Sequence, residues 1–372
     1  LFVVPDRRPS NGGLADNDVT CTSVYHKLGY RGAPITQLAL GEAGDCHGWL
    51  VGEPHAGLSY MFQMMNEARI EIGMAATAIA SAAYHASLDY ARERLQGRPV
   101  TNKDPTLAPV PIIEHPDVKR MLLHQRAMVE GSLALALACT HYADRAQTLQ
   151  GEDKNKCELL VDLLTPAVKS YPAEAGIHAV SQGLQCLGGY GYCADFPLEQ
   201  YYRDVRIHAI HEGTTGVQAL DLLGRKIARG GGRSMFLFVE EVRASLAEAR
   251  GLEPLRARAA QLESALDRLR RVTEHLGALA LGGRVELFLA DATLFLEMFG
   301  TVAVAWQWLR QAIASERGLA SAPSEARARF YRSKLHTFSY FFAYELPKIE
   351  GLATRLLDSD GLTLRSAEEL FT

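Results

Sequence analysis

The chain has 372 residues, of which 48% are hydrophobic and 22% are charged, and its formal net charge is −4. These values are typical of a globular protein of roughly two or three domains, and they do not favour nucleic-acid binding, which usually needs a basic chain or patch. No run of about 18 uncharged apolar residues occurs, so we predict no membrane span.

Residues 1–53 contain short runs of β-favouring residues, separated by Gly, Pro, Asn and Asp as in strands and turns. The runs cover residues 1–4, 18–30, 35–40 and 48–52. Four short strands are few for an independent sheet. The chain also starts at Leu1 without a Met or a signal peptide. We therefore expect this segment to be the C-terminal part of a β-domain that begins upstream.

Helical patterns follow. Residues 55–96 contain no proline, and their apolar residues recur at helical spacing, which predicts a long helix. A proline-rich loop comes next, and helices are then expected over residues 117–150 and 152–189, the latter kinked at Pro166 and Pro172. With a further helix over residues 213–227, these segments predict a four-helix bundle over residues 54–229.

The segment Arg229-Gly-Gly-Gly-Arg233 is the clearest linker, and residues 233–372 form a predicted additional helical domain. Leucines recur every seven residues in it, which indicates either a partner-binding seam or, more commonly, an intramolecular helix face. They are Leu255, Leu262, Leu269 and Leu276. An aromatic run is expected to be a buried face, and it comprises Phe338, Tyr340, Phe341, Phe342 and Tyr344.

The cysteines form no CxxC or CxxH pair, so we predict free thiols of a reducing compartment and a cytoplasmic location.

His208 and His211 lie three residues apart beside Glu212. No third ligand of suitable spacing is apparent, so we predict no metal site.

The segment over residues 185–218 carries the strongest functional signal. It contains a glycine cluster, the charged run Arg203-Asp-Val-Arg206, and a Glu212-Gly-Thr-Thr turn before a predicted helix. Free N–H groups at a helix start can stabilise negative charge, so Glu212 is a candidate catalytic base. The alternative is that Glu212 only caps the helix.

The motifs Gln185-x-x-Gly-Gly-Tyr-Gly-Tyr, Tyr202-Arg-Asp-Val-Arg-Ile and Ile210-His-Glu-Gly-Thr-Thr together resemble the C-terminal signature of the acyl-CoA dehydrogenases. Met64-Met-Asn-Glu-Ala-Arg69 and Tyr90-Ala-Arg-Glu-Arg94 resemble two earlier segments of that family. The region after Gly232 resembles the added helices of its larger members, which include methylthiopropionyl-CoA dehydrogenases.

This resemblance implies FAD as the cofactor and an acyl-CoA as the substrate. Glu212 matches the catalytic base. Matches to cofactor contacts are Arg94, Gln185, Gly188, Gly189 and Thr214. All but Thr214 would face the FAD of a neighbouring subunit in a homodimer or homotetramer. Matches to substrate contacts are Met65, Arg69, His211 and Gly213. Some members carry the base on the early helix, where this chain has Ala68.

In the implied reaction, an acyl-CoA loses a proton from its α-carbon and a hydride from its β-carbon. The α C–H bond is weakly acidic, so the thioester oxygen must receive hydrogen bonds and the carboxylate must be desolvated. Electron-transfer flavoprotein is the acceptor that the family implies. An acyl-CoA oxidase that uses dioxygen, and a non-catalytic flavin-binding or structural helical protein, are the alternatives.

Overall fold

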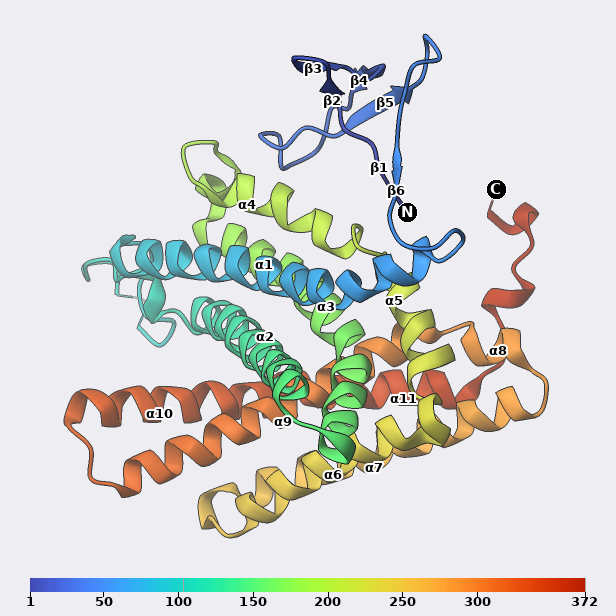
Figure 1. Cartoon of the computed structure of the whole chain (residues 1–372). Helices are drawn as coiled ribbons and strands as arrows, with labels where there is room; N and C mark the ends of the chain where they lie inside the picture. Colours follow the sequence, from blue (N-terminus) through green and yellow to red (C-terminus); the bar gives the residue numbers. More distant parts are fainter. Residues whose placement is uncertain (103, 372) are drawn as a thin grey trace. The chain divides into compact units, whose positions relative to one another are not determined.

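The computed structural model describes residues 1–102 and 104–371, except for the side chains of Phe62 and Gln63. The chain forms two compact units, Leu1–Ala68 and Arg69–Thr372. It is mainly helical with few strands, as predicted (Figure 1). The division between the units falls within the first helix, so the predicted domain boundaries near residues 53 and 229 stay predictions.

The first unit contains three antiparallel strand pairs. Strand β1 (Phe2–Val3) pairs with β6 (Trp49–Leu50), β2 (Arg7–Ser10) with β3 (Gly13–Asp16), and β4 (Val19–Val24) with β5 (Thr36–Leu40). The β2–β3 hairpin was not predicted. Its signal is the Asn11-Gly12 dipeptide, whose glycine has a φ of +98°, a conformation that tight hairpin turns need.

The three long helices were predicted correctly: α1 (Gly57–Glu93), α2 (Pro116–Thr148) and α3 (Gly151–Leu187). Helix α3 is continuous through Pro166 and Pro172. Because Pro172 has no N–H, the carbonyl of Val168 lacks its usual helical partner. That carbonyl lies against Gly73 of α1, where an added Cβ would be 2.0 Å from its oxygen, so α1 and α3 cross closely at this point.

The expected helix over residues 213–227 is shorter than predicted. Helix α5 (Thr215–Asp221) begins two residues later and continues into a π-helical turn, η4 (Leu222–Lys226). Gly213 cannot be part of it, because its φ is +90°. Helix α4 (Leu198–Val205) precedes it, and the short helical turns nearby are η1 (Ile112–Glu114), η2 (Gly188–Tyr192) and η3 (Arg206–Ala209).

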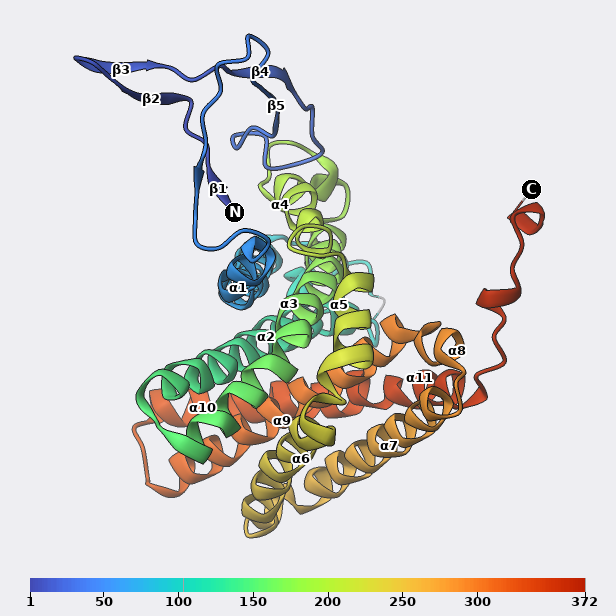
Figure 2. The same ribbon diagram turned by 45° about the vertical axis from the view of Figure 1, so that its right-hand side comes forward.

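Some of the C-terminal helices pack directly on α2 or α3, and the others pack on neighbouring C-terminal helices within the second unit (Figure 2). Trp308 donates its indole N–H to the carbonyl of Ala127 at 3.1 Å. The helices are α6 (Arg229–Arg250), α7 (Arg256–Leu281), α8 (Val285–Leu289), α9 (Ala292–Ala320), α10 (Glu325–Tyr340) and α11 (Ile349–Asp358). Short turns complete the region: η5 (Glu253–Leu255), η6 (Phe341–Glu345), η7 (Leu346–Lys348), η8 (Thr363–Arg365) and η9 (Glu368–Phe371). The predicted linker glycines, Gly230 to Gly232, have φ values of +61°, +69° and +86° and interrupt α6.

Burial settles two of the patterns seen in the sequence. The leucines spaced by seven are all buried, so they form an intramolecular face. The aromatic run is buried except for Tyr344, which is 56% exposed, so the prediction was wrong for that residue. Helix α9 is long and apolar enough to cross a membrane, but 83% of its most apolar window is buried among other helices. Packing in the core accounts for those apolar residues.

Candidate functional site

The turn that carries Glu212 has an unusual backbone. Glu212 has a φ of +53° and Gly213 a φ of +90°. A left-handed conformation costs a non-glycine residue about 1–3 kcal/mol, and it persists only where surrounding contacts enforce it. Two side chains supply such contacts: Gln218 donates its amide to the Glu212 carbonyl at 2.9 Å, and Lys169 donates its ammonium to the Gly213 carbonyl at 2.7 Å. The turn is therefore held from two directions.

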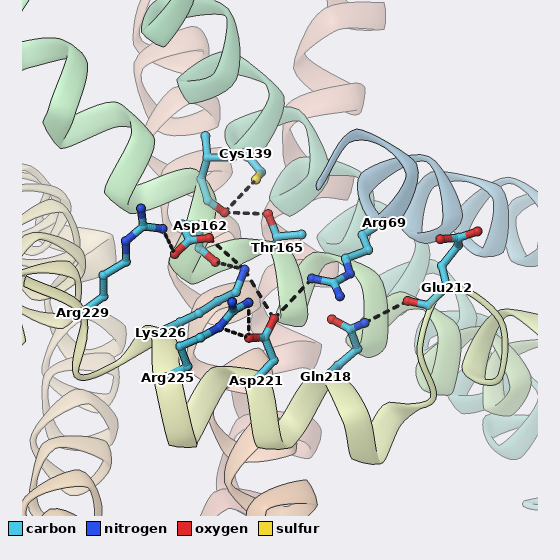
Figure 3. Close-up of polar contacts among 11 residues, drawn as sticks. Arg69, Cys139, Asp162, Thr165, Glu212, Gln218, Asp221, Arg225, Lys226 and Arg229 are labelled. Carbon is cyan, nitrogen blue, oxygen red and sulfur yellow. Dashed lines mark hydrogen bonds and ion pairs between the residues drawn. The ribbon is translucent and has the colours of Figure 1, made fainter. Parts of the chain in front are cut away.

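Glu212 is not the cap of the helix that follows. The N-cap of α5 is Thr214, whose hydroxyl accepts a hydrogen bond from the Val217 amide at 3.4 Å. The Glu212 side chain is half-buried, and in Figure 3 its carboxylate points away from Gln218 while its carbonyl meets the Gln218 amide. The carboxylate is thus available for chemistry.

Polar atoms without hydrogen-bond partners gather near this turn. Arg69, Gln218 and His211 each bury one such atom among the described residues: Nε of Arg69, Oε1 of Gln218 and Nε2 of His211. Unpaired buried groups of this kind call for a specific explanation, such as a bound molecule. They suit a polar ligand at the turn, where the sequence predicted substrate contacts at Arg69, His211 and Gly213.

The histidines beside Glu212 are shielded from water. His208 is buried, with Nδ1 3.1 Å from the Val205 carbonyl oxygen, and its ring meets that of His211 edge-on at 5.3 Å between centroids. Burial lowers the pKa of both histidines, and the charge of Lys169 lowers it further. Among the residues that the structure describes, no group of three or more His, Cys, Asp or Glu side chains is arranged to hold a metal ion.

Arg69 belongs to a buried ion cluster (Figure 3). Its Nη1 lies 3.2 Å from Oδ2 of Asp221, which is also 3.6 Å from the ammonium of Lys226. Lys226 donates to both the carboxylate and the carbonyl of Asp162, at 3.0 and 2.9 Å. That carbonyl is free because Pro166, four residues on, has no N–H. Burial would raise the pKa of Asp162, but the charges of Lys226 and Arg229 outweigh it and lower the pKa.

A cavity of about 320 Å³ brings together three of the predicted cofactor residues: Arg94, Gln185 and Gly188. It lies where the ends of α1 and α3 meet η1. The Arg94 guanidinium sits 5.7 Å from the centroid of the Tyr190 ring, and Gly188 has a φ of +59°. A guanidinium beside bare glycine backbone suits a phosphate or a nucleotide. Gly189 and Thr214 do not line this cavity.

Of the remaining predicted residues, Met65 is half-buried on α1 and belongs to the first unit. Two residues at the turn were not predicted, Lys169 and Gln218. One sequence feature could have pointed to Lys169: it is the charged residue in the otherwise uncharged run from Leu163 to Ala173 of α3. Gln218 gave no comparable signal.

A larger cavity of about 730 Å³ was also not predicted, because its walls come from distant parts of the sequence. Helices α2 and α3 form one side, and α9 with η6 forms the other. Buried Ser170 lines it, and its hydroxyl has no partner among the described residues. Tyr340 and Tyr344 stack at 4.6 Å between ring centroids in its wall.

Two family models match the chain. "Acyl-CoA dehydrogenase, C-terminal domain" covers residues 55–227, and "Acetyl-CoA dehydrogenase C-terminal like" covers residues 238–366. Among curated relatives, the 3-methylmercaptopropionyl-CoA dehydrogenase of Ruegeria pomeroyi is 38% identical over 96% of this chain and 60% of its own length. The broad-specificity linear acyl-CoA dehydrogenase FadE5 of Mycobacterium tuberculosis is 33% identical over 94% of this chain and 59% of its own. The chain thus spans about three fifths of these relatives.

Solved structures agree on the fold. An acyl-CoA dehydrogenase complexed with FAD from Bacillus anthracis has a TM-score of 0.71 at 20% identity, over 96% of this chain and 60% of that one. Caenorhabditis elegans ACDH-11 in complex with C11-CoA has a TM-score of 0.68 at 18% identity, over 95% of this chain and 56% of that one. At such identities the likeness concerns architecture alone.

Proposed function

This chain belongs to the acyl-CoA dehydrogenase family, and we propose from that membership that the complete protein is an FAD-dependent enzyme that oxidises an acyl-CoA to its 2-enoyl-CoA. The observation that carries the proposal is the Glu212 turn. A carboxylate that caps nothing is held there in a costly left-handed conformation by two buried side chains. Such strain is typical of functional sites.

Within this proposal, the Glu212 carboxylate removes the α-proton of the substrate. The backbone N–H of Glu212 donates to the thioester oxygen, which stabilises the enolate charge that develops as the proton leaves. His211, Gly213 and Arg69 line the substrate beside the base. The family resemblance also matches Met65 to a substrate contact. When bound, FAD would accept the hydride from the β-carbon at its N5 position.

The cavity with Arg94, Gln185 and Gly188 fits part of the cofactor. Its guanidinium and exposed glycine backbone suit the phosphate and adenosine portions. We extend the proposal to Gly189, which follows directly, and to Thr214 at the turn. The assembly would be a homodimer or homotetramer in which this cavity serves a neighbouring subunit. Electron-transfer flavoprotein would be the acceptor, and the location cytoplasmic. The names of the relatives favour a dehydrogenase over an oxidase.

The test measures flavin reduction in the complete, FAD-loaded protein, by the loss of flavin absorbance under anaerobic conditions. A panel of acyl-CoA thioesters that includes 3-methylmercaptopropionyl-CoA should contain at least one that bleaches the flavin. Glu212→Gln should bind that substrate and reduce the flavin at least about 10³-fold more slowly, because the amide cannot take the proton. Glu350→Gln, at an exposed side chain of α11, is the control and should leave the rate unchanged. Normal bleaching in Glu212→Gln would refute the assignment.

A further inference from the structure

We propose that Lys169 is a positioning residue of the reaction, whose buried ammonium clamps the turn that carries Glu212. The inference rests on the proposed function, since it assigns a role around the same base. Lys169 lies outside the motifs of this chain on which the resemblance to the family was based. It lies in the middle of α3, and its side chain reaches the turn.

The contact is direct and shielded. Lys169 has no exposed surface, and its Nζ lies 2.7 Å from the carbonyl oxygen of Gly213, the residue after Glu212. Burying an ammonium is costly unless it gains strong partners, and an interior lysine with a single carbonyl acceptor is poorly compensated. An apolar side chain would fill the same space at lower cost. The position of the lysine is therefore better explained by what it does to the turn than by stability.

Its effect on the turn follows from peptide geometry. A peptide unit is planar, so a partner that fixes a carbonyl also fixes the N–H of the next residue. Gln218 fixes the unit between Glu212 and Gly213, and Lys169 fixes the unit between Gly213 and Thr214. Two consecutive units are thus held by side chains from α5 and α3. These two units flank Gly213, so the contacts hold its left-handed backbone, with a φ of +90°, and the peptide unit that follows the Cα of Glu212. The direction of the Glu212 carboxylate depends on where that Cα is held.

Charged and titratable groups surround Lys169 on several elements. Glu174 lies on the same helix, Arg69 on α1, and His208, His211 and Glu212 on the segment that leads into the turn. Burial lowers the pKa of Lys169 to about 8. Arg69 acts in the same direction, whereas Glu174 and Glu212 oppose it. The ammonium is thus present at neutral pH, where its hydrogen bond is charge-assisted and about twice as strong as one from a neutral amine.

The experiment uses Lys169→Met in the complete, FAD-loaded enzyme, with the acyl-CoA that reduces the wild-type flavin fastest. We expect the rate constant of flavin reduction to fall about ten- to hundredfold, because small displacements of a catalytic group have effects of this size. Lys334→Met is the matched control. It removes a largely buried lysine of α10 from an ion pair with Glu130 of α2, and it should retain the wild-type rate.

A pH profile separates positioning from a general structural role. In the wild type, the rate should decline as the pH rises through about 8, because the clamp weakens when Lys169 loses its proton. In Lys169→Met this decline in rate with rising pH, the alkaline limb of the profile, should be absent. Should that variant not retain FAD, Lys169→Gln, which keeps a neutral donor on a shorter stem, replaces it and should show a reduced rate without the limb.

The possible outcomes keep the two proposals apart. If the wild type reduces its flavin with no acyl-CoA of the panel, the proposed function fails and the role of Lys169 fails with it. If the wild type is active and Glu212→Gln is not, but the lysine variant matches the wild type in rate and pH profile, only the clamp is refuted. An equal loss in Lys334→Met would also refute it, since the effect would then not be specific to the turn.

Discussion

Two buried lysines mark the ends of the segment over residues 213–226, and they differ in what surrounds them. Lys226 is its last residue, and Lys169 of α3 contacts its first residue, Gly213. Lys226 is 1% exposed and lies within 3.6 Å of two carboxylates, Asp162 and Asp221, and donates to a backbone carbonyl. Lys169 is 0% exposed, and its described hydrogen bond goes to the Gly213 carbonyl alone. The first is a compensated charge that anchors helices. The second is a poorly compensated charge beside a candidate base, which is the pattern expected of a functional group.

This difference predicts a large loss of stability for Lys226→Met. The substitution leaves Asp162 and Asp221 buried with fewer positive partners, and breaking a buried pair typically costs about 3–5 kcal/mol. We expect the lower end of that range, because Arg229 still reaches Asp162, and Arg69 and Arg225 still reach Asp221. The free energy of unfolding in urea measures it.

Lys154→Met provides the control for this prediction. Lys154 forms an exposed pair with Glu158 one helical turn away, and such pairs contribute about 0.5 kcal/mol or less. If Lys226→Met lowered the free energy of unfolding as little as Lys154→Met, the ion cluster would not stabilise the fold. The contrast between Lys226 and Lys169 would then be lost.

The pH dependence of the free energy of unfolding measures the cost of burying the charged side chain of Lys169. Its pKa falls from an ordinary value of 10.5 to about 8 in the folded protein. Between these two values the unfolded chain binds more protons than the folded one, so the free energy of unfolding rises with pH in this window. One pKa unit corresponds to about 1.4 kcal/mol, which gives a rise of up to about 3 kcal/mol.

Other groups titrate in the same window, so the quantity to measure is the difference between the wild type and Lys169→Met. Urea unfolding from pH 7.5 to 10.5 should show the wild type gaining stability relative to the variant as the pH rises. A difference that stays constant would mean that Lys169 carries no burial cost.

The sequence anticipated most of the helical architecture but less of the site. Long proline-free runs with helical periodicity predicted α1 and α2 well, because a continuous apolar stripe constrains a helix strongly. The start of α5 was misplaced, because Glu212 and Gly213 adopt positive φ values that no local pattern in the sequence announces. Gln218 and Lys169 hold the carbonyls of these two residues, and Lys169 reaches the turn from α3, 44 residues earlier, so the turn rests in part on a tertiary contact.

The candidate site shows the same limit. Arg94, Gln185 and Gly188 were expected together from motif resemblance, and the structure places them around one cavity. Lys169 belongs to none of those motifs, and its partner is a backbone carbonyl 44 residues away. A contact with a carbonyl leaves no trace in the identity of the partner residue. The sequence alone therefore could not pair Lys169 with the turn.

The smallest expected effect is the most informative for the contrast between the lysines. At pH 7, Lys169→Met should change the free energy of unfolding by no more than about 2 kcal/mol. The variant is relieved of a burial cost of about 3 kcal/mol, but it leaves the Gly213 carbonyl without its donor, a loss of about 1–3 kcal/mol. The two terms oppose each other, whereas the same change at Lys226 removes charge from a paired cluster. A loss above about 3 kcal/mol would make Lys169 a second structural anchor, and a fall in flavin reduction would then reflect a damaged fold.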